Sequence, residues 1–323
     1  MSGNPEIELV FHEALTSLDA PAFCRTVRES LATAPGHLWI NLEDVKVADI
    51  AGPAALLQAV KLCHTRGVRV SILPSPMIYR ALLTAGILEE LPLEGPGAGP
   101  SMPIPVAPPE TPSAEPPRFL ARTARLGLRP PSWDELEIFE TWAKDPRLDQ
   151  MVGSQLLSMC RHRGPYHPDF VACAMHDSSA LTLVVQPLVG DAKPIGFVRL
   201  FNVNLAERFA FLETGIVNPR SIRAGWGIEA SRLSLAWAMD ALEIHRVEAK
   251  VYAYNVLSVN SLRRNGFQQE GVLREAKTYE GQRWDILVFA ILEDEMRAQR
   301  VREGFPYMGF WESAERSSGA PLT

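Results

Sequence analysis

The sequence has no long apolar run, few cysteines and no excess of positive charge. No uninterrupted apolar segment approaches the ~18 residues that a membrane-spanning helix needs. The opening residues MSGNPEIELV contain acids where a secretion signal has a basic end and an apolar core. We therefore expect a cytoplasmic protein with no membrane attachment. The formal net charge of -6 provides no general attraction for nucleic acid, so we expect no nucleic-acid partner either.

The cysteines are too few and too scattered for a disulfide framework or a zinc site. There are four of them, with no CxxC spacing: Cys24, Cys63, Cys160 and Cys173. We expect reduced, mostly buried thiols and no metal. Cys160 stands near two histidines in the segment CRHRGPYH, but residues two apart on one segment rarely form a working nucleophile–base pair. Buried thiols are therefore the preferred interpretation.

One stretch of the chain is rich in proline and divides the rest. Ten of the 26 prolines fall between Pro92 and Pro117, interleaved with glycines. Proline lacks the amide donor and fixes φ, so neither helix nor sheet forms in such a run. At 323 residues, the chain is about twice the ~150-residue domain size. We expect an N-terminal domain at 1–93, a linker at 94–117, a C-terminal domain at 118–300 and a tail at 301–323. The aromatic residues of the tail, at 305–311, are expected to pack against another part of the protein.

The N-terminal domain alternates strand and helix. Residues 38–42, 45–47 and 68–72 read as extended pieces, and 77–86 as a closing helix. Between the extended pieces, residues 53–64 place Ala54, Leu57, Val60 and Cys63 on one face of a helix that starts at a proline. This order predicts an α/β domain with its helices packed on the sheet.

The segment LWINLEDVKVADIAGPAALLQAVKLCHTRGVRVSIL resembles STAS domains, the fold of bacterial anti-sigma-factor antagonists, over about residues 17–93. In that family the turn before the helix usually reads Asp-Ser-Ser-Gly, and a serine in it is phosphorylated. Here it reads Asp49-Ile50-Ala51-Gly52, which has no hydroxyl and excludes a phosphoserine switch at this turn. The resemblance implies a module that binds a protein partner or self-associates. The alternative is an inert structural domain. Asp49 is expected to remain a turn residue at the start of the helix.

The C-terminal domain contains a strand, a loop and a helix in a pattern typical of anion binding. Ser132 and Glu135 form a capping-box pattern for a first helix. Strand-like runs follow at 181–185, 195–201 and 209–217, and the last leads into the loop NPRSIRAGWG. Glycines let the backbone approach a ligand, and the amides at a helix start point at an anion. The pattern predicts a phosphate or pyrophosphate site; a tight turn without a ligand is the alternative.

A second segment comes at the expected distance and makes the resemblance specific. A strand at 246–254 is followed by NVLSVNSLRRNGF, an Asn-x-x-Ser segment and then a short helix ending in Gly-Phe. With the loop before it, this segment resembles the GNAT acyl-CoA transferases over about residues 126–292. The sequence thus predicts a STAS-like α/β domain joined by a Pro-rich linker to a GNAT-like α/β domain with a mixed sheet.

The resemblance implies acetyl-CoA, or another acyl-CoA, as co-substrate. Its pyrophosphate would be cradled by the backbone of Arg223, Ala224, Gly225, Trp226, Gly227 and Ile228. Ile222 stands where the family has Gln or Arg, and Arg220 would substitute for that contact. The backbone at Ile216 and Val217 would bind the pantetheine arm and polarise the thioester carbonyl, and Asn255 would bind the pantetheine side.

Acyl transfer to an amine also needs a base and an acid. Glu213 matches the position of the base in N-terminal acetyltransferases of the ribosomal type; a solvent-facing strand carboxylate is the alternative. Leu262 occupies the position of the tyrosine acid of many relatives, so Ser258 is the substitute, as it is in the ribosomal type; a helix N-cap is its alternative role.

The resemblance implies an acyl-CoA-dependent N-acyltransferase, with direct attack of a primary amine on acetyl-CoA as the preferred reaction. The acceptor is a small molecule or a protein-linked amine. We expect residues 151–177 to line its pocket, with Tyr166, His167 and His176 as candidate contacts. Two alternatives stay open: a non-catalytic sensor of acyl-CoA, and an acyltransferase that the STAS domain recruits to a protein or to a carrier-protein thioester.

Overall fold

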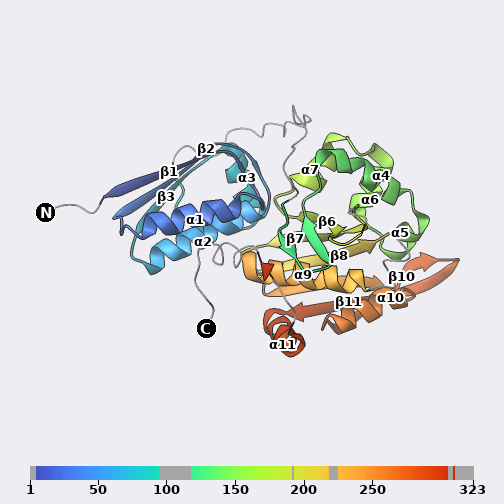
Figure 1. The fold of residues 1–323 in the computed structure, drawn as a ribbon. Coiled ribbons are helices and arrows are strands. Elements are labelled where there is room, and N and C mark those ends of the chain that lie inside the picture. The colour runs from blue at the N-terminus through green and yellow to red at the C-terminus, as the bar shows by residue number, and fades with distance from the viewer. Residues whose placement is uncertain (1–4, 95–117, 191–192, 218–224, 305–307, 310–323) are drawn as a thin grey trace.

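The computed structural model describes residues 5–94, 118–190, 193–217, 225–304 and 308–309, which form two α/β domains side by side (Figure 1). In the N-terminal domain, the strands β1 (Glu6–Leu15), β2 (His37–Ala48) and β3 (Arg69–Pro74) form a parallel sheet in the order β1-β2-β3. Its helices are α1 (Ala20–Leu31), α2 (Ala51–Thr65), α3 (Pro76–Thr84) and the 3-10 turn η1 (Leu88–Glu90).

The alternating pattern of β2 explains the core of the N-terminal domain. Leu38, Ile40 and Leu42 are fully buried, and α1 and α2 lie along one side of the sheet (Figure 1). The two extended pieces predicted at 38–42 and 45–47 are one continuous strand. We predicted no element before residue 38, although Ile7 and Leu9 of β1 alternate with glutamates in the pattern typical of a half-buried strand.

The C-terminal domain is built on a mixed sheet. Its strands are β4 (Ala121–Arg122), β5 (Leu126–Arg129), β6 (Leu181–Pro187), β7 (Gly196–Asn204), β8 (Phe209–Ile216), β9 (Arg246–Tyr252), β10 (Gln268–Tyr279), β11 (Gln282–Leu292) and β12 (Met308–Gly309). They follow the order β10-β11-β9-β8-β7-β6-β5-β4-β12, and β8 and β9 are the only neighbours that pair in parallel among the described strands of this sheet. The rest of the aromatic tail predicted to pack lies outside the described residues.

Helices cover both faces of this sheet. The helices are η2 (Trp133–Glu135), α4 (Leu136–Ala143), α5 (Pro146–Met151), α6 (Gln155–Arg163), α7 (Pro168–Met175), α9 (Trp226–Ala241), α10 (Val256–Arg264) and α11 (Glu293–Glu303). Helices α4–α7 form a separate cluster with Val184 and Phe197 on one face, whereas α9 packs on the other. The predicted capping box is confirmed, because the Ser132 amide donates to Glu135 at 2.9 Å. None of the helices in the described ranges has the length and apolar character to cross a membrane.

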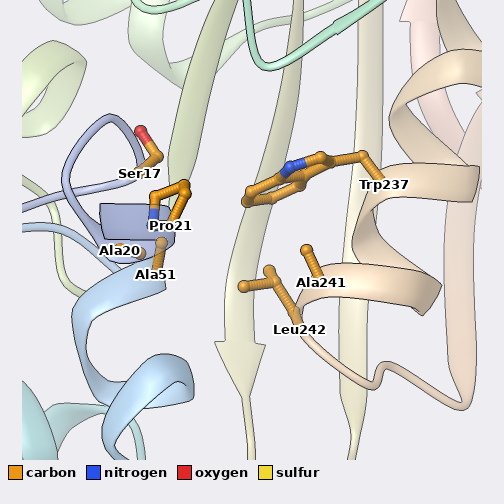
Figure 2. Close-up of a pocket in the computed structure, with 7 residues that line it drawn as sticks. All are labelled: Ser17, Ala20, Pro21, Ala51, Trp237, Ala241 and Leu242. Atoms are coloured by element: carbon orange, nitrogen blue, oxygen red, sulfur yellow. The ribbon is translucent and has the colours of Figure 1, made fainter. Parts of the chain in front are cut away.

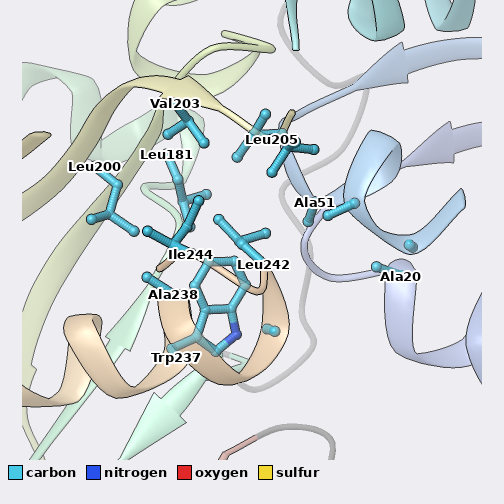
Figure 3. Close-up of a cluster of buried hydrophobic side chains, with 14 of the residues drawn as sticks. Ala20, Ala51, Leu181, Leu200, Val203, Leu205, Trp237, Ala238, Leu242 and Ile244 are labelled. Carbon is cyan, nitrogen blue, oxygen red and sulfur yellow. The ribbon is translucent and has the colours of Figure 1, made fainter. Parts of the chain in front are cut away.

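The two domains are in direct contact. One continuous cluster of buried apolar side chains contains residues of both, including Ala20, Ala51, Leu205 and Leu242 (Figure 3). The proline-rich segment expected to be a linker, at 94–117, is outside the described residues apart from Glu94. The domains therefore share a core in addition to their covalent connection.

The turn that precedes α2 is organised by Asp49. This carboxylate is 5% exposed and accepts hydrogen bonds from the amides of Ser17 at 2.8 Å and Ala51 at 2.9 Å. Burial raises the pKa of Asp49 to about 6, although the two amides act in the opposite direction. Asp49 therefore has the role of a turn residue at the start of the helix.

This raised pKa predicts a pH-dependent stability. The folded state takes up a proton on Asp49 at a pH where the unfolded chain has lost it, so the free energy of unfolding falls as pH rises through about 6. The wild type should lose at most about 3 kcal/mol between pH 4 and pH 7 relative to Asp49→Asn. Urea unfolding at both pH values measures the difference. Asp44→Asn, at an exposed position on β2, the strand that precedes Asp49, is the control; an equal pH dependence of wild type and Asp49→Asn would contradict the prediction.

Candidate functional site

Strands β8 and β9, near the middle of the sheet, pair over a short stretch and then diverge. They pair at three positions, Phe209 with Arg246, Ala210 with Val247 and Phe211 with Glu248. On its other side, β8 stays paired with β7 as far as Ile216. Residues 212–216 therefore have no ladder partner on the β9 side among the described residues. Such an edge offers backbone donors and acceptors to an extended ligand.

Helix α9 begins beside the end of β8. Gly225 is its N-cap with φ of +78°, and a Cβ on Gly227 would lie 3.2 Å from Cγ1 of Ile216. The first amides of the helix, at Trp226, Gly227 and Ile228, have no acceptor within the helix and lie at its positive end. The predicted order of strand end, glycine turn and helix start is thus present. Three predicted loop residues, Arg220, Arg223 and Ala224, lie outside the described residues.

The two backbone positions predicted for the pantetheine arm differ in availability. The amide of Val217 donates to the carbonyl of Ile195 at 2.9 Å, so it is occupied. Ile216 is the last residue of β8 and faces Gly196 across the ladder on the β7 side. The backbone of Ile216 lies at the free edge of β8, so it is more available to a ligand than the backbone of Val217.

An arginine that the sequence analysis missed lies at the same place. The Arg125 guanidinium stacks over the Trp226 ring at 4.9 Å and lies 3.4 Å from Glu229 in the first turn of α9. Glu229 also accepts from the Thr123 hydroxyl at 2.6 Å. Arg125 therefore adds positive charge at the start of α9, where the loop arginines were expected to do so. No local signal marked it, because it lies a hundred residues earlier in the chain than α9.

Glu213 lies in the part of β8 that is no longer paired with β9. Its neighbour Thr214 faces α9, since its hydroxyl is 2.9 Å from that of Ser231. Glu213 therefore points to the opposite face, toward α4–α7. Its Oε1 is buried and has no hydrogen-bond partner in the described part of the chain. The alternative of a solvent-facing strand carboxylate is wrong.

Burial raises the pKa of Glu213, while a hydrogen bond from the Ser154 side chain and the Arg199 guanidinium act against that rise. Arg199 is 6% exposed and stands opposite Glu213 in the β7–β8 ladder. Its Nη2 lies 3.3 Å from Asp177 and 3.1 Å from the Cys173 sulfur. With both carboxylates ionised, this buried group carries one net negative charge, which favours a cationic ligand.

Asn255 and Ser258 lie at the start of α10. Asn255 Oδ1 accepts from the Ser258 amide at 3.1 Å, and its Nδ2 donates to the Met151 carbonyl at 2.9 Å. The N-cap of this helix is therefore Asn255, and the alternative role of Ser258 as the cap is wrong. The side chain of Asn255 is committed to these two bonds, whereas the Ser258 hydroxyl stands in the first turn.

The predicted acceptor contacts divide into surface and buried positions. Tyr166 is 42% exposed and packs on Trp133, and His167 caps α7. His176 ends that helix, and its Nδ1 is buried without a hydrogen-bond partner among the described residues. Burial lowers the pKa of His176, which keeps its imidazole neutral. Of the three, His176 belongs most clearly to the interior.

The cysteines in the described ranges form no disulfide. All four cysteines are free, with Cys24, Cys63 and Cys160 buried and Cys173 half-buried. Burial raises the pKa of Cys160 to about 11, which leaves it an unreactive thiol. No group of three or more His, Cys, Asp or Glu side chains in the described ranges is arranged to hold a metal ion.

Comparison with known proteins assigns both domains. Residues 3–95 match the sequence model of the STAS domain, and residues 125–268 match that of the acetyltransferase (GNAT) domain. The probable N-acetyltransferase YjcK of Bacillus subtilis is 35% identical over 106 residues, 32% of this chain and 56% of that protein. The uncharacterized N-acetyltransferase p20 of Bacillus licheniformis is 32% identical over 71 residues, 22% of this chain and 40% of that protein. The chain thus spans about half the length of these curated relatives.

Among solved structures, the spermidine N-acetyltransferase of Vibrio cholerae in complex with CoA and spermine aligns with a TM-score of 0.47 at 19% identity. The alignment covers 54% of this chain and 99% of that one. The two family matches account for the order of strands and helices in each half of the molecule. Residues 3–95 are a STAS domain, and residues 125–268 are an acetyltransferase domain of the GNAT family.

Proposed function

We propose that this chain is an N-acetyltransferase that transfers the acetyl group of acetyl-CoA to a primary amine by direct attack. The observation that carries the proposal is the Glu213 carboxylate, with its buried Oε1, on the free part of β8, next to the open N-terminus of α9. In this arrangement the free edge of β8 binds the acyl donor, and the face of β8 directed toward α4–α7 binds the amine acceptor.

The start of α9 supplies the donor site. The amides of Trp226, Gly227 and Ile228 bind the pyrophosphate at the positive end of the helix, and Arg125 adds charge beside them. The pantetheine arm runs along the free edge of β8 toward Glu213. There the backbone of Ile216 donates to the thioester carbonyl as negative charge develops on its oxygen.

Glu213 is the general base. An amine reaches the site as an ammonium ion and must lose its proton before it attacks the thioester. A carboxylate whose pKa is raised by burial accepts that proton more readily than a solvated one. The net negative charge of Glu213, Asp177 and Arg199 together favours entry of the ammonium form. A sensor without turnover would not need such a group, so its presence favours the enzyme.

Ser258 is the proposed acid that protonates the departing thiolate. Its amide is fixed by Asn255, which places the residue at the corner between β9 and α10. The neighbouring Tyr254 is unsuited to this role, because its hydroxyl already donates to the Gln150 carbonyl at 2.6 Å. The acceptor proposed here is a primary amine on a small molecule or a protein.

The Glu213→Gln variant tests the base. Without the carboxylate, kcat should fall by about 100-fold to 10,000-fold, and the dissociation constant for acetyl-CoA should stay unchanged. Release of free CoA with a panel of primary amines measures the rate. Wild-type kcat/KM should fall with decreasing pH as Glu213 becomes protonated, and the variant should lose this dependence. Glu207→Gln, at an exposed position in the β7–β8 turn, is the control; equal rates for both variants would rule out Glu213 as the base.

The Ser154→Ala variant tests the cause of the Glu213 pKa. Since the Ser154 hydrogen bond lowers that pKa, its loss should shift the acid limb of kcat/KM to higher pH. Ser154 also caps α6, so the variant should lose about 1 kcal/mol of stability. Ser75→Ala is the matched control, because Ser75 caps α3 at the same 3.2 Å distance in the other domain. An unshifted acid limb in Ser154→Ala would contradict the assignment.

The Gly225→Glu variant tests the donor site. A carboxylate at the start of α9 repels a pyrophosphate, so acetyl-CoA affinity should fall about tenfold or more. Gly67→Glu is the matched control, since both glycines have positive φ, +78° and +67°, and open space where a Cβ would stand. Calorimetric titration of the full chain measures both. Undiminished binding by Gly225→Glu, or no binding by the wild type, would remove this site from the proposal.

A further inference from the structure

The N-terminal turn of α2 is covered by the acetyltransferase domain. Ala51, the first residue of α2, is 4% exposed, and Trp237 and Leu242 of the other domain are 3% and 4% exposed. Together with Ser17, Ala20, Pro21 and Ala241 they line a small, partly open cavity of about 10 Å³ between the domains, where the Trp237 ring faces Pro21 (Figure 2). A space of this size admits about one water molecule. The two surfaces are therefore closely fitted.

Polar contacts surround this apolar centre. Gln58 Nε2 donates to the Ala241 carbonyl at 2.8 Å, and Lys61 Nζ lies 2.7 Å from Glu243 Oε2. Gln58 and Lys61 are both on α2, so this helix contacts the end of α9 along more than two turns.

A second set of contacts lies away from α2. The Leu205 amide, in the β7–β8 turn, donates to the Ala85 carbonyl at the end of α3 at 3.1 Å. Arg118 Nη2 donates to the Leu18 carbonyl at 3.0 Å. Figure 3 shows Leu205 and Leu242 side by side with Ala51 in the same apolar cluster. The domains thus meet through several elements on each side.

We infer that the turn Asp49–Gly52 with α2 is a docking surface whose partner is helix α9 of the same chain. The apolar centre with its polar surround has the anatomy of a specific protein interface. It excludes any other protein from this turn while the domains are docked. This inference is independent of the proposed chemistry, because no residue of the donor or acceptor site takes part in it.

The docking explains the composition of the turn. In STAS domains a phosphorylated serine stands in this turn, and here its two central residues are Ile50 and Ala51. Ile50 is fully buried, and Ala51 faces Trp237 and Leu242. A phosphate or any other charge at residue 51 would be buried against apolar side chains without a partner, which is strongly unfavourable. A small apolar residue is what this interface requires.

Zero-length carbodiimide cross-linking of the full chain tests the inference. The reagent joins Lys61 to Glu243 when the domains are docked, and mass spectrometry identifies the linked peptides. Lys46 and Glu13, 3.2 Å apart within the N-terminal domain and also solvent-exposed, form the internal control. A mixture of isotopically light and heavy protein distinguishes links within one chain from links between two. We expect a Lys61–Glu243 link within single chains, at a yield that does not depend on protein concentration.

Substitutions at the docking surface provide a second test of the inference. Ala51→Arg should lower the Lys61–Glu243 yield about tenfold or more relative to the Lys46–Glu13 yield, whereas Ala51→Ser, which adds one uncharged atom, should change it less than twofold. Leu242→Arg places the charge on the other domain and should have the same effect as Ala51→Arg, so unfolding of one domain cannot account for both losses. Absence of the link in wild type, light–heavy links, or an undiminished yield in both arginine variants would each overturn the inference.

Discussion

Packing of helix α9 against other elements at both of its ends is the constraint on which the rest of the molecule depends. At its start, Gly227 lies against Ile216, which fixes the helix to the strand that has parted from β9. At its other end, Trp237 and Leu242 are covered by the N-terminal domain. The helix dipole, the free strand edge and the docking surface are therefore placed by one element. The same helix thus connects the docking surface with the proposed donor site.

The buried polar group around Glu213 shows how the sheet supports a charge in its interior. A carboxylate without water requires compensation, and here Arg199 on the adjacent strand and Ser154 at a helix start supply it in part. Full compensation would lower the pKa and produce an inert ion pair. Because Arg199 also lies within 3.3 Å of Asp177, its charge is divided between two acids. Glu213 thereby remains basic enough to take a proton.

The sequence predicted what local patterns determine. The strand–glycine–helix order at Gly225, the capping box at Ser132 and the strand with Glu213 follow from periodicity and helix-start chemistry within a few residues. The contacts that modify these elements could not be read in this way, because Ser154 and Arg199 reach Glu213 only through packing of helices and strands far apart in the chain. The apolar spacing of Leu233, Ala236 and Trp237 likewise places them on one face of α9, and on periodicity alone that face is assigned to a single domain.

Trp237 shows why that last assignment matters. Its place on the apolar stripe of α9 is what a core residue of a single domain would show, yet it faces Pro21 and Ala51 of the other domain. Residue 51 stands in the very turn where STAS domains have a serine, so one packing contact accounts both for an aromatic residue on α9 and for the missing hydroxyl on α2. Residue 51 lies in an apolar contact between the domains, where a charged group would be buried without a partner. Asp49 in the same turn is buried too, but the amides of Ser17 and Ala51 donate to its carboxylate.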